Sequence, residues 1–306
     1  MACRVEFISR GITIVGHLYM PPKSAPDRRQ AAIVVGHPTI GVKEQTAGLH
    51  ATHLAGRGFI ALAYDSAYQG ESAGEPRGLE DPIQRAEDVR SAVTFLSTHP
   101  SVDPERIGAL GICDAGGYVP FAAQTDVRIK AVAAVSATDI GSLFREGIRN
   151  TAMVTGRRAV QKSMEESGKA RIAEAKGEPI PLAPLVPDDP MDLPPSIPVM
   201  FREASEYFRT PRGQHPRSTN RWAVRSMDLI FNYSSYAFND LISPRPLLMI
   251  VGSEAETIYF SEEAIERAAE PKELFLVPGK THISLYDDLS GHIEKLVDFM
   301  TKALCQ

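Results

Sequence analysis

The chain has 306 residues, of which 43% are hydrophobic and 23% charged, a balance typical of a globular protein with one large domain or two smaller ones. The net charge of −5, with both signs dispersed, argues against nucleic acid or an anionic membrane surface as the main partner. The N-terminus shows no basic region followed by an apolar core, and no apolar run approaches the roughly 20 residues that span a bilayer, so we expect a cytoplasmic protein.

Cysteine usage points to the same compartment. Cys3, Cys113 and Cys305 are odd in number and far apart, which favours a reducing environment over a disulfide framework. The sequence contains no C-x-x-C, H-E-x-x-H, P-loop or G-x-G-x-x-G motif, so we expect no metal, nucleotide or other cofactor.

The first 140 residues alternate between apolar strand-like runs and helical patterns. Residues 5–20 predict two strands around Arg10-Gly11, forming an antiparallel hairpin at a sheet edge. Strands covered on both faces are then predicted at residues 31–35, 59–64, 107–112 and 129–135. Helices are expected at about residues 43–56, 82–98 and up to 124. This alternation predicts an α/β fold with a mostly parallel sheet and helices on both faces.

The alternation of strand and helix patterns stops after Asp139 for about a hundred residues and then resumes. Residues 142–176 look helical, residues 179–198 carry eight prolines, and residues 198–208 are helical again. Strands follow at 246–252 and 273–277, with helices beginning near Ser261, an expected N-cap, and at about residue 289. We therefore expect a core formed by residues 1–139 and 240–306, interrupted by a helical, Pro-rich lid insert at residues 140–239.

Cys113 is the candidate nucleophile. It follows an apolar strand and has Gly111 two residues before it and Ala115 two residues after, giving G-x-C-x-A where G-x-S-x-G is commoner. A nucleophile at a sharp strand-to-helix turn needs small residues at these positions so that the helix and strand can approach. Asp114 is the alternative nucleophile, but that register puts Ile112 where a small residue is required.

A thiol nucleophile needs a base and a group that orients the base. In this architecture the chain order is nucleophile, acid, histidine, which selects His282, just after the last predicted strand. Glu254, two residues beyond the strand at 246–252, is the preferred acid, with Glu256 and Asp139 as alternatives.

The other site residues follow from the same geometry. We expect the oxyanion hole to use the backbone N–H of Asp114 and an N–H from the loop containing Thr39 and Ile40. His37 and the insert aromatics are candidates for binding an apolar substrate. The candidate substrate-binding residues are His37, Tyr68, Phe201, Phe208, Trp222, Phe231 and Tyr233.

With these motifs the chain resembles the α/β-hydrolase superfamily, and more closely its dienelactone-hydrolase-like and fungal polyketide-transferase-like branch. The similar segments are residues 37–46 (HPTIGVKEQT), 68–72 (YQGES), 106–118 (RIGALGICDAGGY), 252–255 (GSEA) and 281–287 (THISLYD). The resemblance implies an eight-stranded hydrolase fold acting on thioesters, esters or lactones, often in secondary metabolism. Asp114 beside the thiol, and a glutamate near the acid position, depart from the branch pattern.

Three functions remain open at this stage. The first is Cys-His-acid catalysis on an activated carbonyl of an apolar, polyketide-like metabolite, with hydrolysis or acyl transfer. The second is condensation or cyclisation with His282 as general base and no covalent step. The third is a hydrolase-like ligand-binding protein. The expected partner is a small apolar molecule, and the sequence is compatible with a homodimer.

Overall fold

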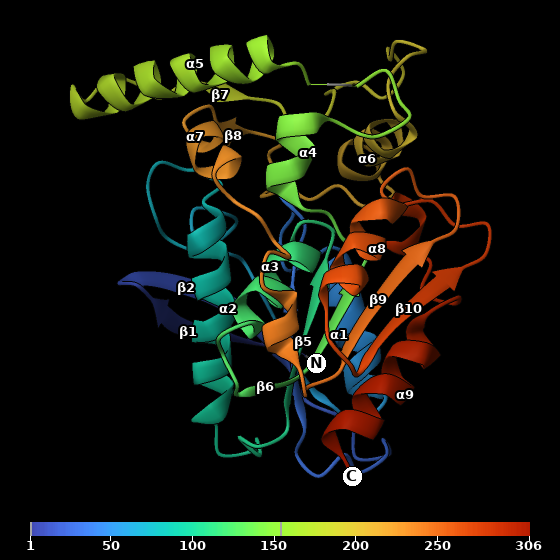
Figure 1. Cartoon of the computed structure of the whole chain (residues 1–306). Coiled ribbons are helices and arrows are strands. Elements are labelled where there is room, and N and C mark those ends of the chain that lie inside the picture. Colours follow the sequence, from blue (N-terminus) through green and yellow to red (C-terminus); the bar gives the residue numbers. More distant parts are fainter. Residues whose placement is uncertain (1, 154) are drawn as a thin grey trace.

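The computed structural model describes every residue except 1 and 154. Its centre is an eight-stranded sheet with the order β1-β2-β4-β3-β5-β6-β9-β10 (Figure 1). The strands are β1 (Ala2–Ser9), β2 (Ile12–Tyr19), β3 (Ala32–Gly36), β4 (Ile60–Tyr64), β5 (Ile107–Ile112), β6 (Ile129–Val135), β9 (Leu247–Gly252) and β10 (Lys272–Val277). The predicted fold class and the eight strands are confirmed.

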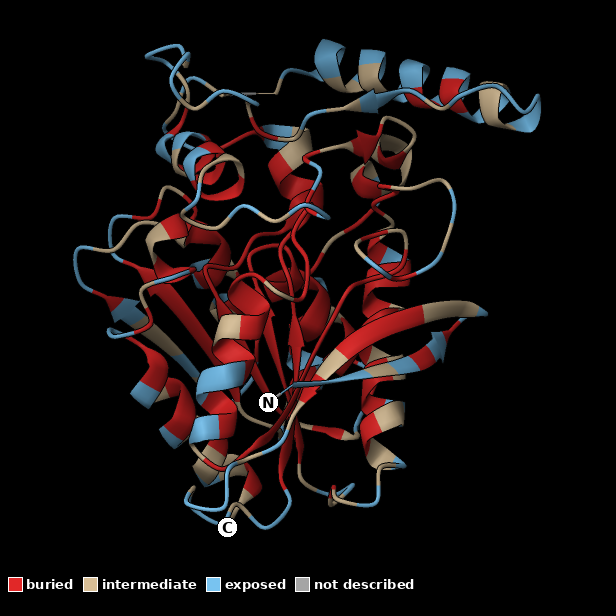
Figure 2. Ribbon diagram, turned by 180° about the vertical axis from the view of Figure 1, so that it is seen from behind, coloured by how far each residue is buried: buried red, intermediate tan, exposed pale blue. Residues whose placement is uncertain are grey.

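The direction of each strand follows from its hydrophobic pattern. β1 is mostly exposed and β2 is half-buried, and the two pair antiparallel to form the expected hairpin at one edge. β3 to β6 and β9 pair parallel and are almost wholly buried, because helices cover both of their faces (Figure 2). The carboxyl ends of the parallel strands therefore meet at one end of the sheet, where ligands bind in open α/β sheets.

Helices cover both faces of the sheet. One layer contains α1 (Thr46–Gly56) and α9 (Ile293–Leu304), and the two helices are joined where Nε2 of His50 lies 3.1 Å from Nε2 of His292. The other layer contains α2 (Pro82–Ser97), α3 (Ala115–Ala123) and α8 (Ile258–Arg267). Within the part of the chain that is described, no helix has both the length and the apolarity needed to cross a membrane.

Helix α8 corrects one sequence prediction. It begins at Ile258, not near Ser261, which lies inside the helix. Tyr259 and Phe260 are buried, so packing of this first turn on the core outweighs the capping preference of the serine. Thr257, at the N-cap, makes no side-chain capping bond because its hydroxyl is engaged elsewhere.

Residues between β6 and β9 lie above the carboxyl ends of the strands (Figure 1). This segment, which we call the insert, contains α4 (Ile140–Glu146), α5 (Arg157–Ala175), β7 (Leu182–Ala183), α6 (Val199–Arg209), β8 (Trp222–Ala223), α7 (Ser226–Phe231) and the short η1 (Asn239–Ile242). The expected helix at 142–176 is divided, because Gly147 adopts a φ of +85° and ends α4. Most of α5 is exposed, whereas α6 packs one face on the core (Figure 2).

Candidate active site

Cys113 occupies a strained turn between β5 and α3. Its φ of +58° lies in the left-handed region, which a residue with a Cβ rarely adopts. A Cβ on Gly111 would lie 1.9 Å from the Ala115 carbonyl oxygen, so only glycine permits the close approach of strand and helix here. Asp114 has ordinary helical angles, so the apex of the turn is Cys113 and not the alternative nucleophile.

His282 lies in the loop after β10, at the same end of the sheet as Cys113. Ser136, the residue that follows β6, holds this loop by donating from its hydroxyl to the His282 carbonyl oxygen at 2.7 Å. The imidazole is buried, and burial lowers its pKa to about 3. His282 is therefore neutral across the physiological range.

The group beside the imidazole Nδ1 is a threonine. Thr257 Oγ1 lies 2.6 Å from Nδ1 of His282, at the N-cap of α8. Glu254, the preferred acid, has an exposed side chain. The alternative Glu256 accepts a hydrogen bond from the Met200 amide at 3.0 Å, and the alternative Asp139 caps α4 by accepting from the amides of Gly141 and Ser142. The structure thus brings none of the three candidate carboxylates to the imidazole.

Tyr286 is a site residue that the sequence interpretation missed. Its hydroxyl lies 3.4 Å from Nε2 of His282, and its hydrogen bonding lowers the pKa of the Cys113 thiol against the larger effect of burial. The ring is held edge-on by Tyr207 of α6, with 5.3 Å between ring centroids, and the Tyr286 carbonyl accepts from Thr46 Oγ1 at 2.8 Å. Its position four residues after His282 was the only sequence signal that it could share the site.

Electrostatics keep the thiol protonated. Burial, and then the adjacent Asp114 carboxylate, raise the pKa of Cys113 well above its usual range. Asp114 Oδ2 accepts from the thiol at 3.7 Å, and its other oxygen accepts from the hydroxyl of Thr138. At pH 7 Cys113 is therefore a neutral thiol and His282 a neutral imidazole.

The raised pKa of Cys113 predicts how the thiol responds to pH. Because raising the pH removes the thiol proton, thiolate absorbance at 240 nm, taken as the difference between the wild type and Cys113→Ser, is expected to stay flat up to about pH 9 and rise only above it. The subtraction cancels the tyrosines and the other two cysteines. A rise centred below pH 8 would show that a thiolate forms in the resting protein.

The predicted oxyanion loop faces Cys113 from the end of β3. Residues 38–41 form a tight turn in which the Gly41 amide donates to the Pro38 carbonyl at 2.9 Å, and Ile40 is held at a φ of +59°. A positive φ is strained for a β-branched residue. Ser218 of the insert fixes this conformation by donating to the Ile40 carbonyl at 2.7 Å. Thr39 is buried, and its hydroxyl has no protein partner among the described residues.

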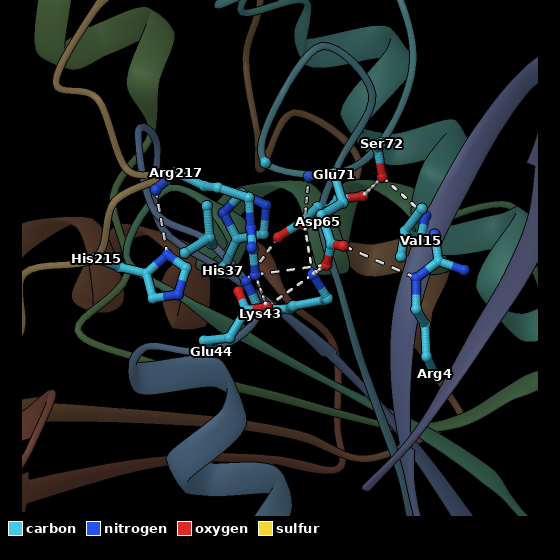
Figure 3. Close-up of polar contacts among 12 residues, drawn as sticks. Arg4, Val15, His37, Lys43, Glu44, Asp65, Glu71, Ser72, His215 and Arg217 are labelled. Atoms are coloured by element: carbon cyan, nitrogen blue, oxygen red, sulfur yellow. Dashed lines mark hydrogen bonds and ion pairs between the residues drawn. The ribbon is translucent and has the colours of Figure 1, made fainter.

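A buried charge cluster anchors the oxyanion loop to the loop after β4 (Figure 3). Nζ of Lys43 is fully buried and donates to Asp65 at 2.8 Å, and it also pairs with Glu44 and Glu71. Burial acts to lower the pKa of Lys43, but the carboxylates, led by Asp65, raise it overall. Asp65 also accepts from the backbone amides of Lys43 and Glu71, each at 2.8 Å. The sequence interpretation gave Lys43 and Asp65 no role.

An apolar cavity of about 30 Å³ is lined in part by Cys113. Its walls come from the core and from the insert. The lining residues are Pro38, Thr39, Cys113, Asp114, Leu143, Phe144, Leu185, Val186, Met200, Phe201, Ala204, Phe208, Ile283 and Tyr286. This described lining contains one carboxylate and no Lys, Arg or His. The cavity has room for little more than a water molecule, so it is too small as it stands for a substrate-sized ligand.

Of the seven candidate substrate-binding residues, two line the cavity and five do not. Phe201 and Phe208 line the cavity, whereas Trp222 packs behind it on Phe144, with 4.9 Å between ring centroids. The cavity lining does not include Tyr68, Phe231 and Tyr233.

His37 lies behind the oxyanion loop and not on the cavity. Its Nδ1 lies 2.7 Å from the Pro38 carbonyl oxygen, and its Nε2 accepts from the Ser66 amide at 3.0 Å. Both ring nitrogens are therefore engaged in holding the loop.

The loop that carries His282 is bound to the insert at both ends. Before His282, the Thr281 hydroxyl donates to Glu203 of α6 at 2.6 Å. After Tyr286, Asp287 accepts two hydrogen bonds from Arg212, at 2.7 and 2.8 Å. The insert therefore covers the cavity and also holds the loop of the candidate base.

The sheet order, the strained turn at Cys113 and the histidine loop define an α/β-hydrolase fold. The family profile and the relatives found by comparison support a hydrolase or acyltransferase. The profile of the Dienelactone hydrolase family matches residues 14–140. The resemblance inferred from the motifs, to the dienelactone-hydrolase-like and polyketide-transferase-like branch of the α/β-hydrolase superfamily, is confirmed.

Three proteins illustrate how close the similarity is. The uncharacterized protein YcjY of Escherichia coli K12 is 39% identical over 277 residues, covering 90% of this chain and 89% of YcjY. The crystal structure of the hypothetical protein PA2218 from Pseudomonas aeruginosa superposes with a TM-score of 0.91 at 36% identity, covering 99% and 94% of the two chains. Polyketide transferase claH of Penicillium crustosum is 24% identical over 310 residues, covering 98% of this chain and 97% of claH.

Proposed function

We propose that the protein transfers acyl groups through a thioester on Cys113, taking a neutral, apolar thioester, ester or lactone as substrate. The observation that carries the proposal is the strained Cys113, which lines an apolar cavity together with Pro38 and Thr39 of the oxyanion loop. The name of the fungal relative supports a substrate of the polyketide type. The insert acts as the lid of the proposed site.

In the proposed reaction the sulfur attacks the carbonyl carbon while the thiol proton passes to Nε2 of His282. This role requires the tautomer with the other proton on Nδ1, donated to Thr257 Oγ1. Thr257 therefore takes the orienting role that the sequence assigned to Glu254. Without a carboxylate the imidazolium gains little stabilisation, so proton removal must accompany bond formation to sulfur.

The oxyanion is proposed to lie between the amide of Asp114 and the turn at Thr39 and Ile40. The Asp114 amide already points at the sulfur, where it lowers the thiol pKa against the larger effect of burial. The unpartnered Thr39 hydroxyl supplies a further donor at the cavity wall. As the tetrahedral intermediate collapses, His282 returns its proton to the leaving group, and water or a second nucleophile then removes the acyl group.

The charge of the cavity sets the substrate class. A carboxylate on the acyl chain would be buried beside Asp114 with no cation in the described lining to pair with it. Burying an unpaired charge costs several kcal/mol. Among acyl groups of similar size, neutral chains are therefore the expected substrates.

The test uses two thioesters of N-acetylcysteamine with four-carbon acyl groups, butanoyl and succinyl. We expect intact-mass and peptide analysis to find one butanoyl group on Cys113, and succinyl transfer to be at least about 10²-fold slower. A variant with Cys3→Ser and Cys305→Ser should behave like the wild type. Failure to form any adduct on Cys113 would refute the covalent mechanism, and equal rates would refute the charge argument.

A second candidate function is condensation or cyclisation with His282 as general base. The protonated thiol favours it, because Asp114 and burial both oppose thiolate formation. Product analysis in ¹⁸O-labelled water distinguishes it from hydrolysis, since only hydrolysis places solvent oxygen in the product.

A further inference from the structure

The hydroxyl of Tyr286 lies 3.4 Å from Nε2 of His282, and Tyr286 and Cys113 line the same cavity. No hydrogen bond among the described residues joins Cys113 to His282 directly, so the tyrosine is the group beside the imidazole that also faces the thiol side of the cavity. We propose that Tyr286 is a catalytic residue that carries the proton from the thiol to the imidazole. This inference rests on the proposed acyl transfer and adds a step to it.

The surroundings of Tyr286 fix the hydroxyl in this bridging position. Tyr207 and Phe208 of α6 pack edge-on against the ring, and the main chain is held by Thr46 from α1. Thr257 holds the opposite side of the imidazole, so Nε2 is directed to the tyrosine. The relay is therefore assembled by three separate parts of the chain.

The step conserves protons and electron pairs. As sulfur bonds to the carbonyl carbon, its proton moves to the Tyr286 oxygen, and the phenolic proton moves to Nε2 of His282. The phenol is neutral before and after, so no tyrosinate accumulates. This agrees with burial, which raises the pKa of Tyr286 well above its usual range. When the tetrahedral intermediate collapses, the proton returns from Nε2 through the Tyr286 hydroxyl to the leaving group.

Tyr286→Phe tests the relay because it keeps the packed ring and removes only the hydroxyl. With p-nitrophenyl butanoate at pH 7, we expect the acylation rate constant to fall at least about 10²-fold and KM to change less than threefold. Tyr236→Phe is the matched control: Tyr236 is equally buried, and its hydroxyl donates to the carbonyls of Gly116 and Thr138, away from the proposed proton path. Its acylation rate should stay within threefold of the wild type.

A proton inventory in mixtures of H₂O and D₂O separates a relay from a merely structural role. The relay moves two protons in one step, so the wild-type acylation rate should curve with deuterium fraction, and the residual rate of Tyr286→Phe should vary linearly. A linear proton inventory for the wild type overturns the inference, even if the variant fails to fold. An effect of Tyr286→Phe on KM alone, with an unchanged acylation rate constant, also overturns it. Absence of any acyl adduct on wild-type Cys113 is a different result and refutes the proposed function itself.

Discussion

Replacing Cys113 by alanine is expected to lower the turnover of p-nitrophenyl butanoate by at least about 10³-fold and to abolish the acyl adduct. The substitution removes one sulfur atom from a buried site, and alanine retains the Cβ that the strained turn already accommodates. The residual rate would come from the oxyanion donors and from substrate binding alone. Steady-state kinetics and intact-mass analysis measure the two effects.

The control for this variant is Cys305→Ala. Cys305 is half-buried near the C-terminus, and its thiol donates to the Arg28 carbonyl at 3.5 Å, at the opposite end of the sheet from Cys113. Its loss should leave turnover within a factor of two. If Cys113→Ala retains turnover within tenfold of the wild type, the reaction does not proceed through sulfur, and general-base catalysis by His282 becomes the better account.

The second large effect is on stability. Replacing Lys43 by methionine is expected to lower the free energy of unfolding by about 3–5 kcal/mol, because it leaves the Asp65 carboxylate buried without its cation. Denaturant unfolding at pH 7 measures the change. Since Lys43 lies two residues after the turn at residues 38–41, acylation of Cys113 should slow as well.

The double variant Lys43→Met with Asp65→Asn shows whether an unpaired charge is the cause. Asparagine keeps an oxygen for the amides of Lys43 and Glu71 but removes the negative charge, so the double variant should be more stable than Lys43→Met alone. Lys295→Met breaks a partly exposed pair with Glu273 and should cost at most about 1 kcal/mol. A double variant less stable than the single one would contradict the explanation.

Local patterns were sufficient to predict most of the fold. Buried parallel strands need continuous apolar runs, so such runs alone were sufficient to predict β3, β4, β5 and β6. The turn at Cys113 was also readable, because Gly111 and Ala115 reflect the close approach of neighbouring chain segments. Chain order then selected His282, and the structure places it at the same end of the sheet as Cys113.

The partners of His282 could not be read in the same way. Glu254 follows β9 at the expected distance, but a tight turn in which the Ala255 amide donates to the Gly252 carbonyl directs its side chain to solvent. Thr257 reaches Nδ1 because α8 begins one turn earlier than its serine and glutamates suggested. Tyr286 and Lys43 gain their contacts only through tertiary packing, which leaves no periodic trace in the sequence.

The attachment of the histidine loop to the insert links access to reactivity. Thr281 and Asp287 bracket the imidazole and bind Glu203 and Arg212, so a displacement of α6 large enough to break these contacts also releases the loop. An acyl group on Cys113 would then meet bulk water only when its general base is out of register. In the proposed mechanism this coupling would suppress premature hydrolysis, and the acceptor enclosed together with the acyl group would decide the product.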